Sequence, residues 1–323
     1  MDIALALLTI VGLALFETIT SIDNAVINAD VLRTMSARAR KWFLVWGLLF
    51  AVFIVRGLLP FVIFWLANPG MGPIEAVTAT FSSDPKVVES IEASRPILML
   101  AGGIFLVFLF LHWLFLEPKS FGLRGESRIA KYGIWFFAIV SLLLLLIVWL
   151  ALGISPLLAF GAVVGSTAFF IVHGFKENAA EQEKKLMQGH SMSDFSKILY
   201  LEIIDTTFSI DGVIGAFAFT LSVPLILLGN GLGAFIVREL TIHNIERVKK
   251  YKYLKNGAMY SVFFLGIIMV FSAFGTHVPE FISPIITFAV IGFFFIKSKQ
   301  ELEREAQKPK PAAGKQEAKI PLQ

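Results

Sequence analysis

The chain alternates between long apolar blocks and shorter polar connections. Nine blocks are predicted to cross a bilayer, because a helix of about 20 apolar residues spans about 30 Å of hydrocarbon. They cover residues 3–32 (interrupted near 22–24), 42–67, 96–116, 132–151, 155–173, 198–221, 223–238, 258–275 and 279–296. The pattern therefore predicts an all-α polytopic membrane protein with about nine transmembrane helices.

Basic residues set the expected orientation. Nearly all of the 28 Lys and Arg residues lie on alternate connections, and such residues favour the cytoplasmic side. The basic segments are 33–41, 117–131, 174–197, 238–257 and the tail after 297. Nine spans then place the N-terminus outside and the C-terminus in the cytoplasm, with the chain in a plasma (bacterial inner) membrane. This distribution explains the net charge of +4 without a nucleic-acid partner.

Composition agrees with a chain whose main partner is the lipid bilayer. The sequence is 56% hydrophobic and only 16% charged, whereas soluble domains average about 45–50% and about 25%. It has no cysteine, which excludes disulfides and thiolate metal sites. The acidic outer loop 68–95 is expected to be a solvated loop, and the polar tail is expected to be disordered beyond a frayed helix.

An internal repeat is predicted from two related segments. ETITSIDN at 17–24 and DTTFSIDG at 205–212 share one pattern at an offset of 188 residues. A glycine followed nine residues later by an arginine also occurs twice in the same order, as Gly47 with Arg56 and as Gly229 with Arg238. Two agreeing elements indicate duplication. Because four spans separate the two acidic spans, the halves run in opposite directions, which is the inverted-topology repeat of many secondary transporters.

The repeat also predicts how the chain is organised. The expected units are a first membrane half at 1–173 (a repeat core at 3–67 plus spans three to five), a cytoplasmic connection at 174–197, a second membrane half at 198–296 and the tail at 297–323.

Acidic side chains inside these spans are the candidate functional residues. Five of them facing lipid would together cost on the order of 10 kcal/mol, so they must face one another, a cation or water. Their oxygen chemistry suits a hard divalent cation such as Mn²⁺, Mg²⁺ or Ca²⁺. The predicted metal ligands are Glu17, Asp23, Asn24, Glu202, Asp205 and Asp211, and the supporting residues are Ser21, Ser209, Arg56, Arg238 and Asn230.

Helical spacing divides the predicted ligands into two groups. Glu17, Ser21 and Asn24 share one helix face, and Glu202, Asp205 and Ser209 share another. Asp23 and Asp211 lie off these faces and join the site only if helices one and six are broken near the Ser-Ile-Asp sequences. Asn24 and Gly212 are poor helix formers at these points. A purely structural alternative is that the acids pair only with the two intramembrane arginines or with helix ends.

These residues resemble the TerC family of integral membrane proteins, within a wider group that includes LysE-type exporters. Glu17, Ser21, Asp23 and Asn24 match a first family motif, and Glu202, Asp205, Phe208 and Asp211 match a second. Gly212 replaces a serine of the second motif, and Thr20 replaces a leucine of the first. The resemblance covers about residues 1–296 of a divergent branch and implies Mn²⁺ export, metal homeostasis or tellurite resistance.

The favoured function is a secondary transporter that exports a divalent cation, with Mn²⁺ implied by the resemblance, in exchange for H⁺. No GxxxxGK[ST] pattern for an ATP-driven engine is present, and no enzyme activity or resident cofactor is predicted. Three alternatives remain open: an exporter of small organic cations or amino acids, an intramembrane aspartyl protease with Asp23 and Asp211 as its dyad, and a scaffold that helps to metalate secreted proteins. The oligomeric state is not predicted.

Overall fold

The computed structural model describes residues 2–47, 49–50, 56–67, 70–79, 85–119, 122–123, 125–187 and 193–307. Within these residues the secondary structure is helical, with no strand. Predictions for the middle of the second span, for part of the loop 68–95 and for the tail beyond 307 fall outside the described residues.

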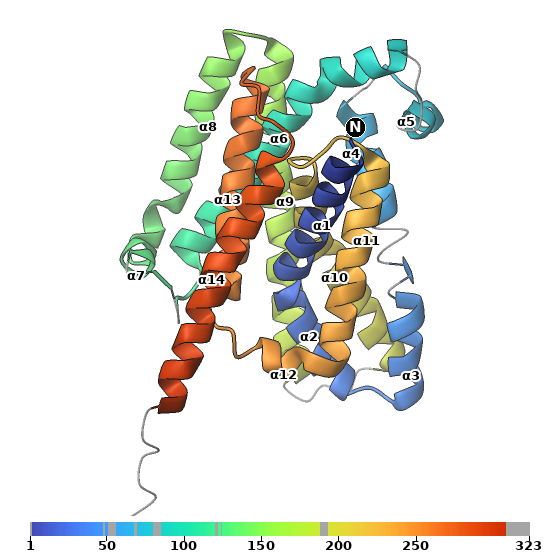
Figure 1. The fold of residues 1–323 in the computed structure, drawn as a ribbon, viewed down its shortest axis with the longest axis vertical. Helices are drawn as coiled ribbons and strands as arrows, with labels where there is room; N and C mark the ends of the chain where they lie inside the picture. The colour runs from blue at the N-terminus through green and yellow to red at the C-terminus, as the bar shows by residue number, and fades with distance from the viewer. Residues whose placement is uncertain are drawn as a thin grey trace, which may run out of the picture.

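The elements follow one another as a series of helices (Figure 1). The first half contains α1 (Ile3–Thr20), α2 (Ile22–Arg33), α3 (Ala37–Trp42), the π-turn η1 (Phe43–Gly47), α4 (Arg56–Ala67), α5 (Pro73–Ala79), α6 (Pro85–Leu116), α7 (Glu126–Ala130), the 3-10 turn η3 (Gly133–Trp135) and α8 (Phe136–Leu152). These elements are followed by α9 (Pro156–Met187), α10 (Asp194–Ala216), α11 (Val223–Glu239), the π-turn η4 (Leu240–Asn244), α12 (Ile245–Val248), α13 (Leu254–Ala273) and α14 (Ile282–Gln307).

Seven helices of the described chain are long and apolar enough to cross a membrane. They begin at Ile3, Glu92, Gly133, Pro156, Val223, Leu254 and Ile282. The predicted membrane class is therefore confirmed at the level of a multi-helix bundle. Of the two other predicted spans, 198–221 corresponds to α10, which carries four carboxylates, and 42–67 includes residues that are not described.

Small residues bring the long helices close together. α1 packs along α11, while α6 packs along both α9 and α13, as Figure 1 shows. A Cβ atom at Gly165 of α9 would lie 2.1 Å from the carbonyl oxygen of Ala101 in α6. Close backbone approach of this kind is how membrane helices gain packing energy where lipid removes the hydrophobic driving force.

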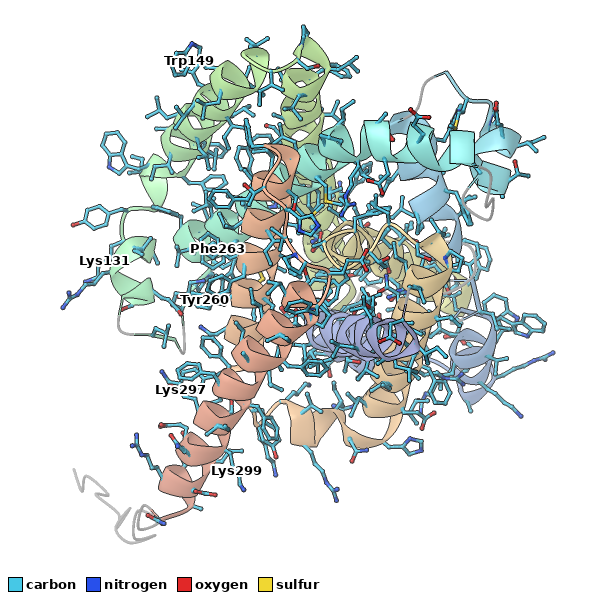
Figure 2. The ribbon with its side chains drawn as sticks, turned by 45° about the horizontal axis from the view of Figure 1, so that its top comes forward. Lys131, Trp149, Tyr260, Phe263, Lys297 and Lys299 are labelled. Carbon is cyan, nitrogen blue, oxygen red and sulfur yellow. The ribbon has the colours of Figure 1, made fainter. Side chains whose placement is uncertain are left out.

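The outer surface of the bundle carries many exposed apolar side chains, as on α8. Trp149 on α8 is 69% exposed, and Leu142 and Leu145 of the same helix are similarly exposed (Figure 2). Lys297 and Lys299 follow the apolar part of α14 toward one end of the bundle. That end, which also carries the end of α2 and the start of α10, is called the basic end below. An apolar belt with charges gathered at one end is the surface expected of a membrane bundle.

The predicted break in the first acidic helix occurs at a single residue. α1 ends at Thr20 and α2 begins at Ile22, and Ser21 between them has φ −88° and ψ 2°. The Ser21 amide still donates to the Glu17 carbonyl (3.1 Å), and the Ser21 carbonyl accepts from the Ala25 amide (2.9 Å). The interruption is therefore a kink whose amides remain satisfied.

The predicted break in the second acidic helix is wrong. α10 runs unbroken from Asp194 to Ala216 through the whole Ser-Ile-Asp sequence. An unbroken helix satisfies its own amides, which is worth several kcal/mol per group away from water. Gly212 lies in the interior of this continuous helix. Because the helix does not unwind, Asp211 keeps the position on its surface that helical spacing gives it.

Candidate functional site

Arg56 joins two carboxylates from different parts of the chain. Its guanidinium contacts Glu17 Oε1 through Nε (3.0 Å) and Nη2 (2.9 Å), and Nη1 donates to Asp205 Oδ2 at 3.2 Å. Arg56 is 3% exposed and Glu17 is fully buried. A charge at this depth is stable only with a partner. These three residues, called the Arg56 triad below, tie α1, α4 and α10 together.

Neighbouring polar groups orient the two carboxylates. Ser21 Oγ donates to Glu17 Oε1 at 2.9 Å, and Asn24 Nδ2 donates to Asp205 Oδ1 at 2.6 Å. The structure thus brings together the helix face that the sequence predicts for the first acidic span. Ser209 behaves differently, because its hydroxyl donates to the main-chain carbonyl of Asp205 at 2.5 Å. It bonds to the backbone of its own helix.

Two glycines make room for the acids. A Cβ atom at Gly212 would lie 2.3 Å from Glu17 Oε2, and one at Gly47 would lie 2.3 Å from Glu202 Oε1. A serine side chain at position 212 would meet the carboxylate of Glu17. The glycine therefore has a steric role at the triad that motif comparison alone does not reveal.

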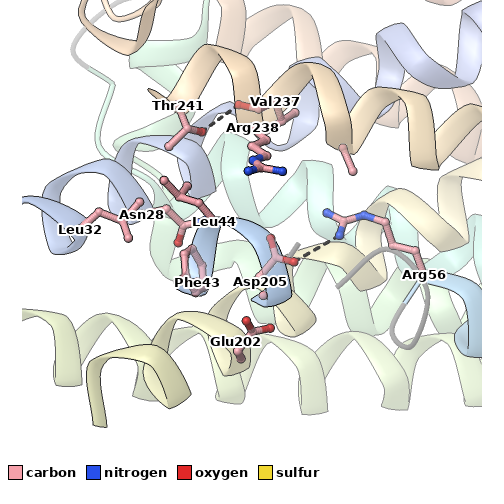
Figure 3. A pocket seen from close by; sticks show the side chains of 12 residues that line it. Asn28, Leu32, Phe43, Leu44, Arg56, Glu202, Asp205, Val237, Arg238 and Thr241 are labelled. Carbon is pink, nitrogen blue, oxygen red and sulfur yellow. Dashed lines mark hydrogen bonds and ion pairs between the residues drawn. The ribbon is translucent and has the colours of Figure 1, made fainter. Parts of the chain in front are cut away.

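A cavity of about 60 Å³ lies beside the triad (Figure 3). Its lining includes Leu32 and Arg238, near the ends of α2 and α11 at the basic end. It is lined by Asn28, Leu32, Phe43, Leu44, Gly47, Arg56, Glu202, Asp205, Ala234, Val237, Arg238 and Thr241. Glu202 Oε1 and Asn28 Oδ1 are buried and have no hydrogen-bond partner among the described residues. Unpaired buried oxygens are costly, so the cavity is a place where a cation or water would be stabilised.

Asn28 is a site residue that the sequence reasoning missed. It stands four residues after Asn24 and eleven after Glu17, which places it near the same helix face. Asn28 continues the spacing of Glu17, Ser21 and Asn24 but lies beyond the repeated segment 17–24. The cavity thus extends the predicted face by one further turn of α2.

Arg238 and Asn230 both belong to α11 but differ in position. Arg238 lines the cavity, and its Nε is buried without a partner among the described residues. Asn230 is fully buried, and neither atom of its amide is hydrogen-bonded within the described chain. It is not among the residues that line the cavity. The structure therefore brings Arg238 to the predicted site but does not place Asn230 in its wall.

Asp23 and Asp211 do not join the triad. Asp23 Oδ2 pairs with Lys255 Nζ at 2.9 Å, and the same nitrogen lies 2.6 Å from Glu117 Oε2. Asp211 pairs with Lys176 of α9. Because α10 stays helical and the break at Ser21 is only a kink, both aspartates keep the off-face positions that an intact helix gives them. Their predicted convergence with the other acids does not occur in this structure.

A preformed metal site would need several carboxylate or histidine side chains that face one point. In the part of the chain that the structure describes, no group of three or more His, Asp or Glu side chains is placed to hold a metal ion. The positive charge shared by Glu17 and Asp205 is the guanidinium of Arg56. Metal binding by these residues stays a prediction, and it requires rearrangement of the triad or use of the adjacent cavity.

A family comparison places the chain among related proteins. It belongs to the family described as "Protein of unknown function (DUF475)", whose profile matches residues 22–305. The match includes the second half of the first acidic span, α4, α10 and α11. The matched range therefore contains all the residues that line the cavity, and Arg56 and Asp205 of the triad, whereas Glu17 lies before it.

A curated relative supports the membrane class. The chain is 29% identical over 126 residues to "Uncharacterized membrane protein YceF" of Bacillus subtilis (strain 168). The aligned part covers 38% of this chain and 48% of that protein, so the chain matches about half the length of this relative. No solved structure matches the chain.

Proposed function

We propose that this protein is a secondary transporter that carries a divalent cation out of the cytoplasm. The observation that carries the proposal is the cavity beside the Arg56 triad, where Glu202 and Asn28 present buried, unpaired oxygens next to Asp205. Carboxylate and amide oxygens suit hard cations. Ionisable groups at this depth in a membrane bundle usually mark a substrate path.

The two sides of the triad differ in access. A second cavity of about 440 Å³ at the basic end shares Leu32, Leu44 and Thr241 with the first. On the opposite side the rings of Phe16 and Phe219 are buried, with their centroids 5.8 Å apart. We assign the basic end to the cytoplasm by the positive-inside rule. In this proposal, the structure represents a state that takes up its substrate from the cytoplasm.

The nine-span inverted repeat belongs to the same proposal. α10 and the 42–67 segment supply the eighth and ninth spans, so the N-terminus lies outside a plasma (bacterial inner) membrane and the C-terminus inside. Reciprocal glycine contacts support the repeat: Gly47 lies against Glu202 of α10, and Gly229 lies against Leu13 of α1. The 188-residue offset pairs Glu202 with Ala14, which is the neighbour of Leu13 in the sequence.

Export of a divalent cation needs an energy source. Moving two charges outward against 100 mV costs about 4.6 kcal/mol. Protons entering in exchange would supply this energy, because a protonated carboxylate releases a bound metal. The TerC resemblance makes Mn²⁺ the first substrate to test.

Two alternatives have less support from the geometry. A cavity of about 60 Å³ holds an ion with a few waters but is small for an amino acid. The aspartyl protease hypothesis needs Asp23 and Asp211 to share a proton, whereas each is paired with its own lysine. The cation transporter therefore accounts for the site best.

The first test is transport by purified protein in proteoliposomes. With the extravesicular side acidic, release of trapped Mn²⁺ is expected from vesicles that contain the parental chain. Glu202→Gln removes the unpaired carboxylate of the cavity and is expected to lower the rate at least about tenfold, since it deletes one charged ligand. Glu239→Gln is the matched control, because Glu239 is exposed and lies outside the cavity lining.

Three results would contradict the proposal. One is the absence of Mn²⁺, Mg²⁺ and Ca²⁺ movement under every pH gradient. Another is release of trapped amino acids in place of metal, which would select the organic-cation alternative. The third is an equal loss of rate in Glu202→Gln and Glu239→Gln, which would assign the effect to surface charge.

A further inference from the structure

Two arginines approach the same carboxylate from different helices. Arg56 of α4 donates to Asp205, and Arg238 of α11 points into the cavity from the other side (Figure 3). Only Arg56 makes an ion pair with Asp205 among the described residues. Arg238 Nε is buried without a hydrogen-bond partner there. One guanidinium is thus engaged and the other is available.

The proposed repeat relates the positions of the two arginines. Each follows a glycine by nine residues, and each of these glycines packs against an acidic helix, Gly47 on α10 and Gly229 on α1. If the repeat is inverted, equivalent residues lie at opposite depths. Arg238, in the last turn of α11, lies between Asp205 and the basic end. Arg56 lies on the side of the buried Phe16 and Phe219.

Resting on the proposed function, we propose that Arg238 is the inner counterpart of Arg56. Arg56 holds Glu17 and Asp205 and keeps the path closed toward the outside. In the outward-open state, Arg238 pairs with Asp205 and closes the cavity toward the cytoplasm, while Arg56 no longer pairs with Asp205. Arg238 is therefore a positioning residue that acts on the substrate through Asp205.

Charge balance gives this exchange its physical basis. A buried carboxylate that loses its only cation is strongly destabilised, so Asp205 cannot leave Arg56 without another partner. Arg238 is the second cation that lines the same cavity. Glu202, the other carboxylate in the cavity wall, has an oxygen without a partner and remains available to the transported ion. The bundle can thus change its open side while Asp205 stays paired.

The chain has no cysteine, so a single introduced cysteine is the only thiol that a labelling reagent can modify. Ala234 lines the cavity one helical turn deeper than Arg238, and Ala234→Cys places one thiol there. Inside-out membrane vesicles are treated with a charged, membrane-impermeant methanethiosulfonate reagent, which reaches the thiol only when the cavity is open to the cytoplasm. The labelling rate then reports the open fraction without any transported substrate.

The proposal predicts opposite effects for the two arginines. In the Ala234→Cys background, Arg56→Gln should lower the labelling rate about tenfold, because it removes the pairing that favours the inward-open state. Adding Arg238→Gln should restore the rate, whereas Arg238→Lys should restore it less because the charge is kept. Arg247→Gln is the matched control, because Arg247 lines the second cavity at the basic end, and it should not restore the rate.

Other outcomes overturn the exchange. Unchanged labelling in Arg56→Gln, or equal restoration by Arg238→Gln and Arg247→Gln, would show that Arg238 has no specific closing role. If Arg56→Gln does not accumulate as folded protein, Arg56→Lys provides the same test, with a smaller decrease in labelling expected. The result is separate from the proposed function: reciprocal labelling without Mn²⁺ flux would reject the cargo, and flux without reciprocal labelling would reject the exchange.

Discussion

Arg56→Gln is expected to lower the free energy of unfolding by about 3–5 kcal/mol, because it leaves two buried carboxylates without their cation. Glu17 is fully buried and Arg56 is 3% exposed, so water cannot replace the lost charge. The measurement is unfolding of the purified protein in detergent micelles, followed by circular dichroism with increasing denaturant. No other single substitution proposed for this chain should destabilise it more.

Two further variants separate this effect from general damage. Arg33→Gln breaks the Arg33–Glu246 ion pair, whose side chains are 58% and 62% exposed, and it should leave unfolding nearly unchanged. The triple variant E17Q/R56Q/D205N removes all three charges and should recover part of the stability lost in R56Q. A single variant R56Q as stable as the parental chain would contradict the role of the triad as the charge-balanced centre of the bundle.

Asp205→Asn is expected to weaken Mn²⁺ binding by about 100-fold or more. The change keeps the size of the side chain but removes the triad carboxylate that also lines the cavity, and charged ligands dominate the affinity for a hard cation. Isothermal titration of the detergent-purified protein with MnCl₂ measures the loss. Abolished export in the vesicle assay should accompany it.

A matched control is available on the same helix. Asp194 lies in the first turn of α10, at the exposed end, and Asp194→Asn changes the net charge by the same amount. It should bind Mn²⁺ as the parental chain does. Equal weakening by both substitutions would show that the metal responds to overall charge and not to a site at Asp205.

The sequence is a good guide to the parts of this site that depend on helical spacing. Hydrophobic block lengths predict the bundle, and the spacing of Glu17, Ser21 and Asn24 predicts one helix face. Ser21 and Asn24 do orient the carboxylates of Glu17 and Asp205. Pairing with an intramembrane arginine, which the sequence offers only as the purely structural alternative, is also found for Glu17 and Asp205 with Arg56.

Long-range pairing is the part that could not be predicted. Asp23 and Asp211 carry the same local pattern as the other acids, and only the packing of α13 and α9 assigns them to Lys255 and Lys176. The expectation of two broken helices depended on bringing these aspartates inward. Because Asp23 and Asp211 are each paired with a lysine, unwinding the two acidic helices would bring no electrostatic gain.

The role of Gly212 shows the same limit. From the sequence, Gly212 is interpreted as the loss of a serine hydroxyl from a motif. In the structure, the absence of a side chain at Gly212 leaves space for Glu17 Oε2. A contact between α1 and α10 is not encoded in the local pattern of either helix. We expect that family members with a glutamate at the position of Glu17 also have a small residue at the position of Gly212.

The most direct test of the central claim is the position of a bound cation. Crystals of the protein soaked in MnCl₂, or single crystals grown with it, can be measured near the manganese absorption edge. The account predicts one anomalous peak in the cavity, within bonding distance of Glu202, Asp205 and Asn28. A protein that binds Mn²⁺ in solution but shows its peak beside Asp23 or Asp211, away from the Arg56 triad, would contradict it.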